Sequence, residues 1–213
     1  GNLDAFVANT VENQIYIGNG DGTFTVSNAS SDTNTSWGLG VGDFDGDNNL
    51  DAFIVNYNQK NRVYLGNGDG SFTVSDASSD TNNSRSIAVG HFDDDGYLDA
   101  FVANNGVNRI CLGNGDGTFS VSNASGDTNN SHAVAAGDFD SDTNLDVFVA
   151  NQSAVNRIYL GNGDGTFSVS DASSDTITSY GVAVGDFDGD GNLDAFVANY
   201  YATNRIYIGD GNV

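Results

Sequence analysis

The chain has 213 residues, of which 29 are acidic and 6 are basic, so its formal net charge is −23. A surface this negative repels phosphate backbones and anionic lipids, which argues against nucleic acid as a partner. No apolar run approaches the roughly 18 residues that a membrane helix needs, so we expect no membrane insertion. All of the acidic residues except Glu12 are Asp. The short Asp side chain is typical of tight turns and calcium loops, so the charge indicates site chemistry.

The sequence is one unit repeated every 47 or 48 residues. The heptapeptide Gly-Asn-Gly-Asp-Gly-Thr/Ser-Phe begins at positions 18, 66, 113 and 161, and the segment Leu-Asp-Ala/Val-Phe returns at the same interval. No linker interrupts this register, so we interpret 1–213 as a single repeat domain. Its units run over about 36–83, 84–130 and 131–178, with partial units at about 1–35 and 179–213.

Each unit is predicted to contain four short strands, named here a to d. In chain order around the last repeat they are a strand d at 166–170, a strand a at 180–187, a strand b at 193–199 and a strand c at 204–208. Strand d alternates apolar with small polar residues, which predicts one wet face. Strands a and b are apolar or small almost throughout, which is typical of strands covered on both faces. No segment shows a helical period with caps.

Four-stranded units of this length predict the blades of a β-propeller, and thus an all-β fold. The repeats supply 18 strands, or about four and a half blades. A calcium-loaded parallel β-helix would need a tandem nonapeptide, whereas the Gly-Asn-Gly-Asp-Gly element occurs once per unit. A partial propeller leaves open sheet edges. Our hypothesis is that the chain is a segment of a longer protein, or a subunit whose missing strands come from a neighbouring copy.

The loop between strands a and b has the pattern Asp-x-Asp-x-Asp-x-x-x-Asp. Carboxylates at positions 1, 3, 5 and 9, the position-7 carbonyl and a water would supply six or seven oxygens, a set that suits Ca²⁺. Without a cation, carboxylates this close would repel one another. An EF-hand would need Glu at position 12 and flanking helices, and position 12 here is an apolar strand residue. The predicted calcium ligands are Asp43, Asp45, Asp47, Asn49 and Asp51; Asp93, Asp95, Tyr97 and Asp99; Asp138, Asp140, Asp142, Asn144 and Asp146; and Asp186, Asp188, Asp190, Asn192 and Asp194.

These loops predict about three to four bound Ca²⁺ ions. In the second loop His91 replaces the first Asp, so we expect a weaker or empty site there, with His91 acting as a hydrogen-bonding residue. The Gly-Asn-Gly-Asp-Gly turn between strands c and d carries one Asp per copy and is predicted to be a hairpin turn, not a site.

Two other features are predicted to be structural. The Arg residues that recur on strand c should pair with nearby carboxylates, and they are Arg62, Arg109, Arg157 and Arg205. The lone Cys111 stands where the other units carry Tyr, and we interpret it as a buried apolar substitute.

The motifs resemble the FG-GAP/VCBS repeat family, the blades of integrin-α-like propellers. The resemblance is carried by Val-Gly-Asp-Phe-Asp-Gly-Asp-Gly-Asn-Leu-Asp-Ala-Phe-Val-Ala-Asn at 184–199 and Asn-Arg-Ile-Tyr-Leu-Gly-Asn-Gly-Asp-Gly-Thr-Phe at 156–167. It implies a calcium-stabilised propeller with binding or adhesion roles, including lectins, usually without catalysis. The family typically closes with about seven blades, and this chain departs from that number.

The d–a and b–c connections, which blade topology places on the face opposite the Asp loops, carry most of the differences between units. Aromatic and long polar side chains at such a rim suit sugar stacking or a protein partner. The candidate ligand-binding residues are Trp37, Arg85, His132, Tyr180, Tyr57, Tyr200 and Tyr201.

We therefore expect an extracellular module, secreted or on the cell surface, that binds a glycan or a protein and has no catalytic activity. Millimolar calcium outside cells suits loops of this kind. One alternative is a structural repeat subunit of a surface layer or filament, in which copies of the chain complete one another's open blades. A weaker alternative is a polysaccharide lyase, which would need clustered His, Tyr, Arg or Lys, and the chain has only two His and one Lys.

Overall fold

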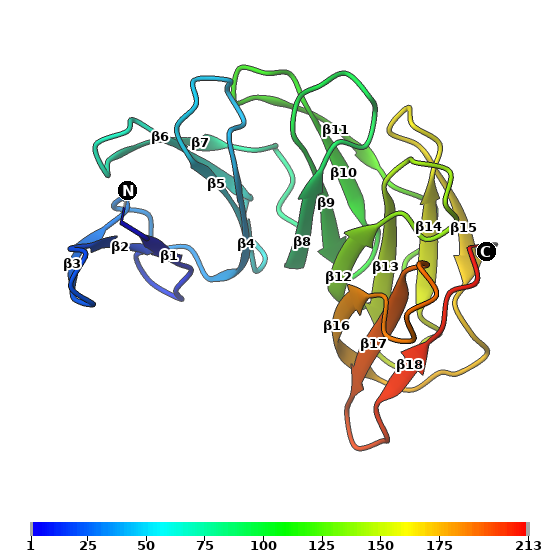
Figure 1. The fold of residues 1–213 in the computed structure, drawn as a ribbon. Coiled ribbons are helices and arrows are strands. Elements are labelled where there is room, and N and C mark those ends of the chain that lie inside the picture. The colour runs from blue at the N-terminus through cyan, green and yellow to red at the C-terminus, as the bar shows by residue number, and fades with distance from the viewer. Residues whose placement is uncertain (1, 212–213) are drawn as a thin grey trace.

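The computed structural model describes residues 2–211, in which 18 strands form five antiparallel sheets (Figure 1). The strands are β1 (Ala5–Val7), β2 (Gln14–Gly18), β3 (Phe24–Asn28), β4 (Ser36–Gly42), β5 (Asp51–Asn56), β6 (Arg62–Gly66), β7 (Phe72–Asp76), β8 (Ser84–Gly90), β9 (Asp99–Asn104), β10 (Arg109–Gly113), β11 (Phe119–Asn123), β12 (Ser131–Gly137), β13 (Asp146–Asn151), β14 (Arg157–Gly161), β15 (Phe167–Asp171), β16 (Ser179–Gly185), β17 (Asp194–Asn199) and β18 (Arg205–Tyr207). Within residues 2–211 no helix is long and apolar enough to cross a membrane.

The sheets follow the predicted repeat. Three have four strands each, β4–β7, β8–β11 and β12–β15, and each sheet pairs its strands in sequence order. The outer two have three strands each, β1–β3 and β16–β18. The all-β fold of about four and a half blades is thus confirmed. The sheets stand around an open arc, with β1–β3 at one end and β16–β18 at the other, and the arc does not close (Figure 1).

The core lies between successive sheets. Strand b of each four-stranded sheet is buried along its whole length, and its two faces serve different cores. On β5, Phe53 and Val55 pack toward the sheet β8–β11, while Ala52 and Ile54 pack toward β1–β3. Each sheet is therefore stabilised by its neighbours, as expected of repeat units that cannot bury their faces alone.

Two predictions about strand exposure have different outcomes. On β15, Phe167 and Val169 are half-buried while Ser168 and Ser170 are exposed, which confirms the alternation of strand d. The prediction that strand a is covered on both faces is wrong, because β8 is half-buried beyond its first residue. The strands a lie along the inside of the arc (Figure 1), where an unclosed ring leaves one face uncovered.

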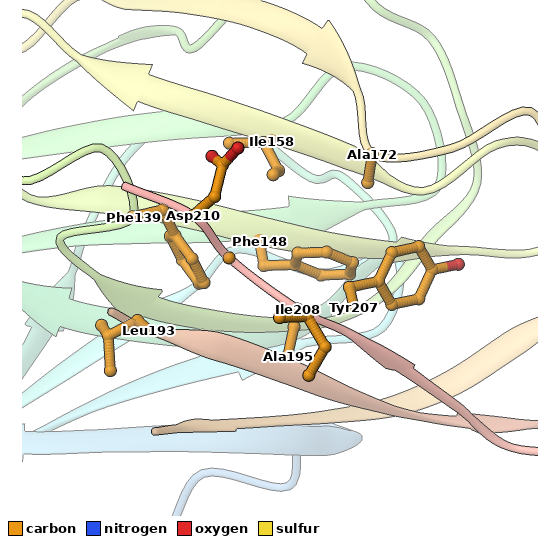
Figure 2. A pocket seen from close by; sticks show the side chains of 10 residues that line it. Phe139, Phe148, Ile158, Ala172, Leu193, Ala195, Tyr207, Ile208 and Asp210 are labelled. Atoms are coloured by element: carbon orange, nitrogen blue, oxygen red, sulfur yellow. The ribbon is translucent and has the colours of Figure 1, made fainter. Parts of the chain in front are cut away.

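The Phe at the start of strand d packs against the preceding sheet. The ring of Phe119 lies 5.6 Å from that of Phe44 and 5.1 Å from that of Phe53, centroid to centroid. The last sheet has no fourth strand within the described residues, and the equivalent place beside Phe139 and Phe148 is a cavity of about 370 Å³. Figure 2 shows the rings of Phe139, Phe148 and Tyr207 lining this cavity.

The residues predicted to be structural behave as expected. Each Arg of strand c pairs with an Asp about 30 residues earlier, in the pairs Arg62–Asp32, Arg109–Asp80, Arg157–Asp127 and Arg205–Asp175. Cys111 is buried, and burial raises the pKa of its thiol to about 12.

Candidate functional site

The four loops between strands a and b each bring three Asp side chains together. In each cluster one carboxylate oxygen from each of the three residues lies within 4.8 Å of the other two. The clusters are Asp43, Asp45 and Asp51; Asp93, Asp95 and Asp99; Asp138, Asp140 and Asp146; and Asp186, Asp188 and Asp194. Three of them join positions 1, 3 and 9, whereas the loop that begins at His91 joins positions 3, 5 and 9.

The Asp at position 9 anchors each cluster to the sheet. Asp51 is buried, and its Oδ2 accepts a hydrogen bond from the backbone N–H of Phe44 at 2.7 Å. Its Oδ1 accepts one from the backbone N–H of Gly66, at the end of β6, at 2.8 Å. Asp99, Asp146 and Asp194 make the same two bonds. Gly66 is required there because an added Cβ would lie 2.4 Å from the carbonyl oxygen of Leu50.

The Asp at position 5 does not join the cluster in three of the loops. Asp47 instead accepts hydrogen bonds from the backbone N–H and the side-chain Nδ2 of Asn49, both at 2.7 Å. These bonds lower the pKa of Asp47. In the second loop Tyr97 has no side-chain amide, so Asp95 accepts only the backbone N–H of Tyr97 and lies in the cluster. Asp142 and Asp190 are held by Asn144 and Asn192 in the same way as Asp47.

The backbone of these loops turns its N–H groups inward. Positions 4 and 6 have positive φ in every copy, for example 78° at Gly46 and 68° at Asn48. The backbone N–H of Gly46 donates to Oδ1 of Asp43 at 2.8 Å, and that of Asn48 donates to Oδ2 at 2.9 Å. The loop therefore presents the first carboxylate in a fixed orientation.

The donor set of the loops fits a Ca²⁺ ion. Burial raises the pKa of Asp99 and of Asp146 to about 6, because their charges lie away from water without a counter-ion. Oδ1 of Asp138 is buried and has no hydrogen-bond partner. Clustered, hard and partly unsatisfied oxygens are the ligands that Ca²⁺ prefers. The residues that would hold it are the three clustered Asp of each loop.

The second loop, which begins at His91, offers fewer free oxygen ligands to a metal ion than the other three loops. The Nδ1–H of His91 donates to the carbonyl oxygen of Tyr97 at 2.7 Å. That carbonyl is at position 7, which we expect to face the ion in the other loops. This loop has thus lost one carboxylate and has its carbonyl hydrogen-bonded, which accords with His91 in a hydrogen-bonding role.

The Gly-Asn-Gly-Asp-Gly turns are hairpin turns, as predicted. In each, the Asp accepts hydrogen bonds from the backbone N–H and the hydroxyl of the residue two positions later, as Asp21 does from Thr23. A second role was not predicted. The backbone N–H of Gly117 donates to the carbonyl of Phe44 at 3.1 Å, so the turn braces the Asp loop of the preceding sheet. The one feature of the sequence that could have indicated this contact is that the turn sequence hardly varies between units.

The opposite face carries the other candidate residues, and β-bulges place four of them. The register between strands a and b shifts in each of the last four sheets, between Ser36 and Gly38 in the first of them. The residues at these shifts are Trp37, Arg85, His132 and Tyr180. A bulge leaves its extra residue out of the hydrogen-bonded ladder and re-aims its side chain. The bulges depend on strand pairing, so the sequence did not reveal them.

All seven candidate ligand residues lie in one row of contacts, here called the aromatic rim. In order the row is Tyr57, Trp37, Arg85, His132, Tyr180, Tyr200 and Tyr201. Trp37 stacks on Tyr57 with centroids 5.0 Å apart and an interplanar angle of 17°. The guanidinium carbon of Arg85 lies 5.6 Å from the centroid of the Trp37 ring. Arg85 also donates a hydrogen bond to Nε2 of His132.

The row continues across the last two sheets. The ring of His132 lies 4.4 Å from that of Tyr180, edge to face. Tyr180 lies 5.1 Å from Tyr200, which in turn lies 4.1 Å from Tyr201. Burial lowers the pKa of His132, and the charge of Arg85 adds to this effect. The rim is therefore a continuous surface of rings with one guanidinium group within it.

Comparison with known proteins agrees with this architecture. FG-GAP-like repeats match residues 1–54, 43–102, 91–149 and 138–197. A solved structure of an Agrocybe aegerita lectin, described by its specific recognition of non-reducing terminal N-acetylglucosamine, is similar with a TM-score of 0.54 and 15% identity. The match covers 100% of this chain and 78% of the lectin, and at that identity it bears on the fold alone. No curated protein sequence matches the chain.

Since the matched repeats run from residue 1 to residue 197, the chain belongs to the FG-GAP-like repeat family.

Proposed function

We propose that the chain is a calcium-stabilised, non-catalytic module that binds glycans outside the cell. The observation that carries the proposal is the aromatic rim. Trp37 is 47% exposed and Tyr180 is 43% exposed, although both are large rings that would gain by burial. Exposed, mutually supported rings offer flat faces on which sugar rings stack.

Tyr201 adds a second argument. Its side chain is 91% exposed and its φ is +50°, a backbone conformation that is unfavourable for a bulky residue. The equivalent turn positions carry Asn58, Gly106 and Ser153, which are ordinary turn residues. Asn at this position would support the turn equally well, so the exposed ring of Tyr201 adds nothing to the stability of the fold. We infer that its role is contact with a ligand.

Calcium has a supporting role in this proposal. The Asp loops lie on the face opposite the rim, where the ion would offset the repulsion within each cluster and hold strands a, b and c together. Extracellular modules bind calcium with modest affinity, at the millimolar level found outside cells. That level motivates the extracellular location. The name of the lectin-like neighbour also supports a glycan as the ligand.

The test is a glycan array in millimolar calcium, repeated with a chelator, followed by calorimetry on the hits. We expect calcium-dependent binding that Trp37→Ala and Tyr180→Ala each weaken at least tenfold. Val41→Ala is the control, because Val41 is 54% exposed but lies on β4 next to the Asp loop, outside the rim. A blank array from folded protein would contradict the proposal and would favour a protein ligand.

A second candidate, self-assembly, is favoured by the exposed apolar faces at the two ends of the arc. Phe24 on β3 is the equivalent of Phe119, and Phe187 and Phe196 are the equivalents of the rings that Phe119 contacts; Phe187 is 50% exposed. We propose that Phe24 of one copy packs on Phe187 of another. Such head-to-tail contacts generate rings or filaments.

Sedimentation velocity over a range of concentrations tests this assembly. We expect association that Phe24→Ser and Phe187→Ser each abolish. Val41→Ser is a suitable control, because Val41 is 54% exposed but lies on β4. A wild-type chain that stays monomeric at every concentration would rule out the assembly.

A further inference from the structure

We propose that the aromatic rim selects glycans in which one sugar carries a carboxylate, and that Arg85 is the residue that binds this group. The inference rests on the proposed glycan-binding function and adds the chemical class of the ligand. It follows from the partners, the position and the free donors of Arg85.

Arg85 stands apart from the other cations of the chain. Each of the others forms an ion pair with Asp, and they are Lys60, Arg62, Arg109, Arg157 and Arg205. Within residues 2–211, Arg85 has no carboxylate partner, although the chain has 29 acidic residues. A desolvated guanidinium without a counter-ion is costly unless a ligand provides one.

One nitrogen of the guanidinium is accessible and free to bind a carboxylate. Nη1 donates to His132, and Nε is buried without a hydrogen-bond partner. Nη2 is not among the buried atoms and makes no hydrogen bond in the described structure. A bound carboxylate would accept a charge-assisted hydrogen bond from Nη2.

The neighbours of Arg85 define what surrounds the carboxylate. Trp37 lies on one side and His132 and Tyr180 lie on the other, so neutral sugar faces could stack next to the acidic one. The net charge of −23 opposes binding of a polyanion. We therefore infer a glycan with an isolated acidic sugar. Hexuronic acids and sialic acids share this chemistry, a carboxylate on a pyranose ring.

The experiment measures calorimetric affinities of the full chain in millimolar calcium for two matched probe pairs. One pair is an oligosaccharide ending in glucuronic acid and the same oligosaccharide ending in glucose. The other pair is sialyllactose and lactose. We expect the acidic member of at least one pair to bind roughly 10- to 100-fold more tightly than its neutral counterpart. The pair that shows the preference identifies the source of the carboxylate.

Variants separate this inference from the proposed function. Arg85→Gln should remove the preference, while Arg85→Lys should keep part of it. Arg205→Gln makes the same change in net charge away from the rim and should leave the preference as it is in the wild type. A preference that survives Arg85→Gln overturns the inference alone. Equal binding within both pairs, lost in Trp37→Ala, also overturns the inference but leaves the proposed function intact. Absence of binding to every glycan overturns both.

Discussion

Backbone strain at single residues is concentrated in the Asp loops. Thr143 has φ +78°, which is unfavourable for a β-branched residue, and the equivalent positions carry Gly96 and Gly191. We predict that Thr143→Gly raises the free energy of unfolding by about 1 kcal/mol, because the relief of strain exceeds the added entropy of the unfolded chain. Urea denaturation measures this. Asn48→Gly is the control, since Asn tolerates this conformation, and an equal gain there would contradict the explanation.

The thiol of Cys111 is the second residue with a predictable behaviour. Burial raises its pKa to about 12, so almost no thiolate is present at neutral pH. We predict no reaction with a thiol-specific disulfide reagent in native buffer and one equivalent of reaction in denaturant. Rapid labelling of the native protein would show that the sheets β4–β7 and β8–β11, which cover this residue, open readily.

Among the loops, the one that begins at His91 allows a test of the metal interpretation. His91→Asp restores the first carboxylate and removes the hydrogen bond that engages the Tyr97 carbonyl. We predict that calorimetry will detect one more Ca²⁺ ion in this variant than in the wild type, or at least tenfold tighter binding at this loop. The control is His91→Asn, which removes the imidazole without adding charge. No difference between the two variants would mean that the loop does not bind calcium.

The strands and the Asp loops could be predicted because each depends on local pattern. Alternation on strand d and the fixed spacing of the loop recur in every unit, so one unit supports the interpretation of the next. The bulge at Arg85 could not be predicted, since it depends on how β8 pairs with β9. The exposure of strand a likewise depends on whether the arc closes. These are tertiary properties that no single window of sequence contains. The orientation of Asp47 is local, because Asn49 two residues later sets it, but the spacing of the Asp residues alone does not show which carboxylates turn toward one another.

At the scale of the whole molecule, acidic and aromatic residues are separated. The Asp clusters and the turns that brace them lie at one face, and the aromatic rim lies at the other. Because strand b connects the two faces directly, an ion bound at the Asp loops would steady the strands on which the rim is mounted. The proposed calcium dependence of ligand binding is thus an effect on stability, without contact between ion and ligand.

The buried carboxyl groups of the Asp clusters predict how the stability of the whole molecule depends on pH. The pKa values of Asp99 and Asp146 are about 6 in the folded chain and close to 4 in the unfolded chain, so the folded state binds more protons between these values. With a chelator present, the stability that these two carboxyls contribute is complete below pH 4 and is lost as the pH rises through 6. The expected loss is about 2 to 3 kcal/mol for each of them.

Urea denaturation between pH 4.5 and 7 measures this dependence. His132 acts in the opposite direction, because burial lowers its pKa and the unfolded state then binds the extra proton. The comparison is therefore best made in a His132→Gln background. In saturating calcium the slope should reverse, because the ion binds only the ionised carboxylates and is displaced by protons at low pH. A chelated protein whose stability rises steadily with pH would contradict the buried, uncompensated state of these carboxyls.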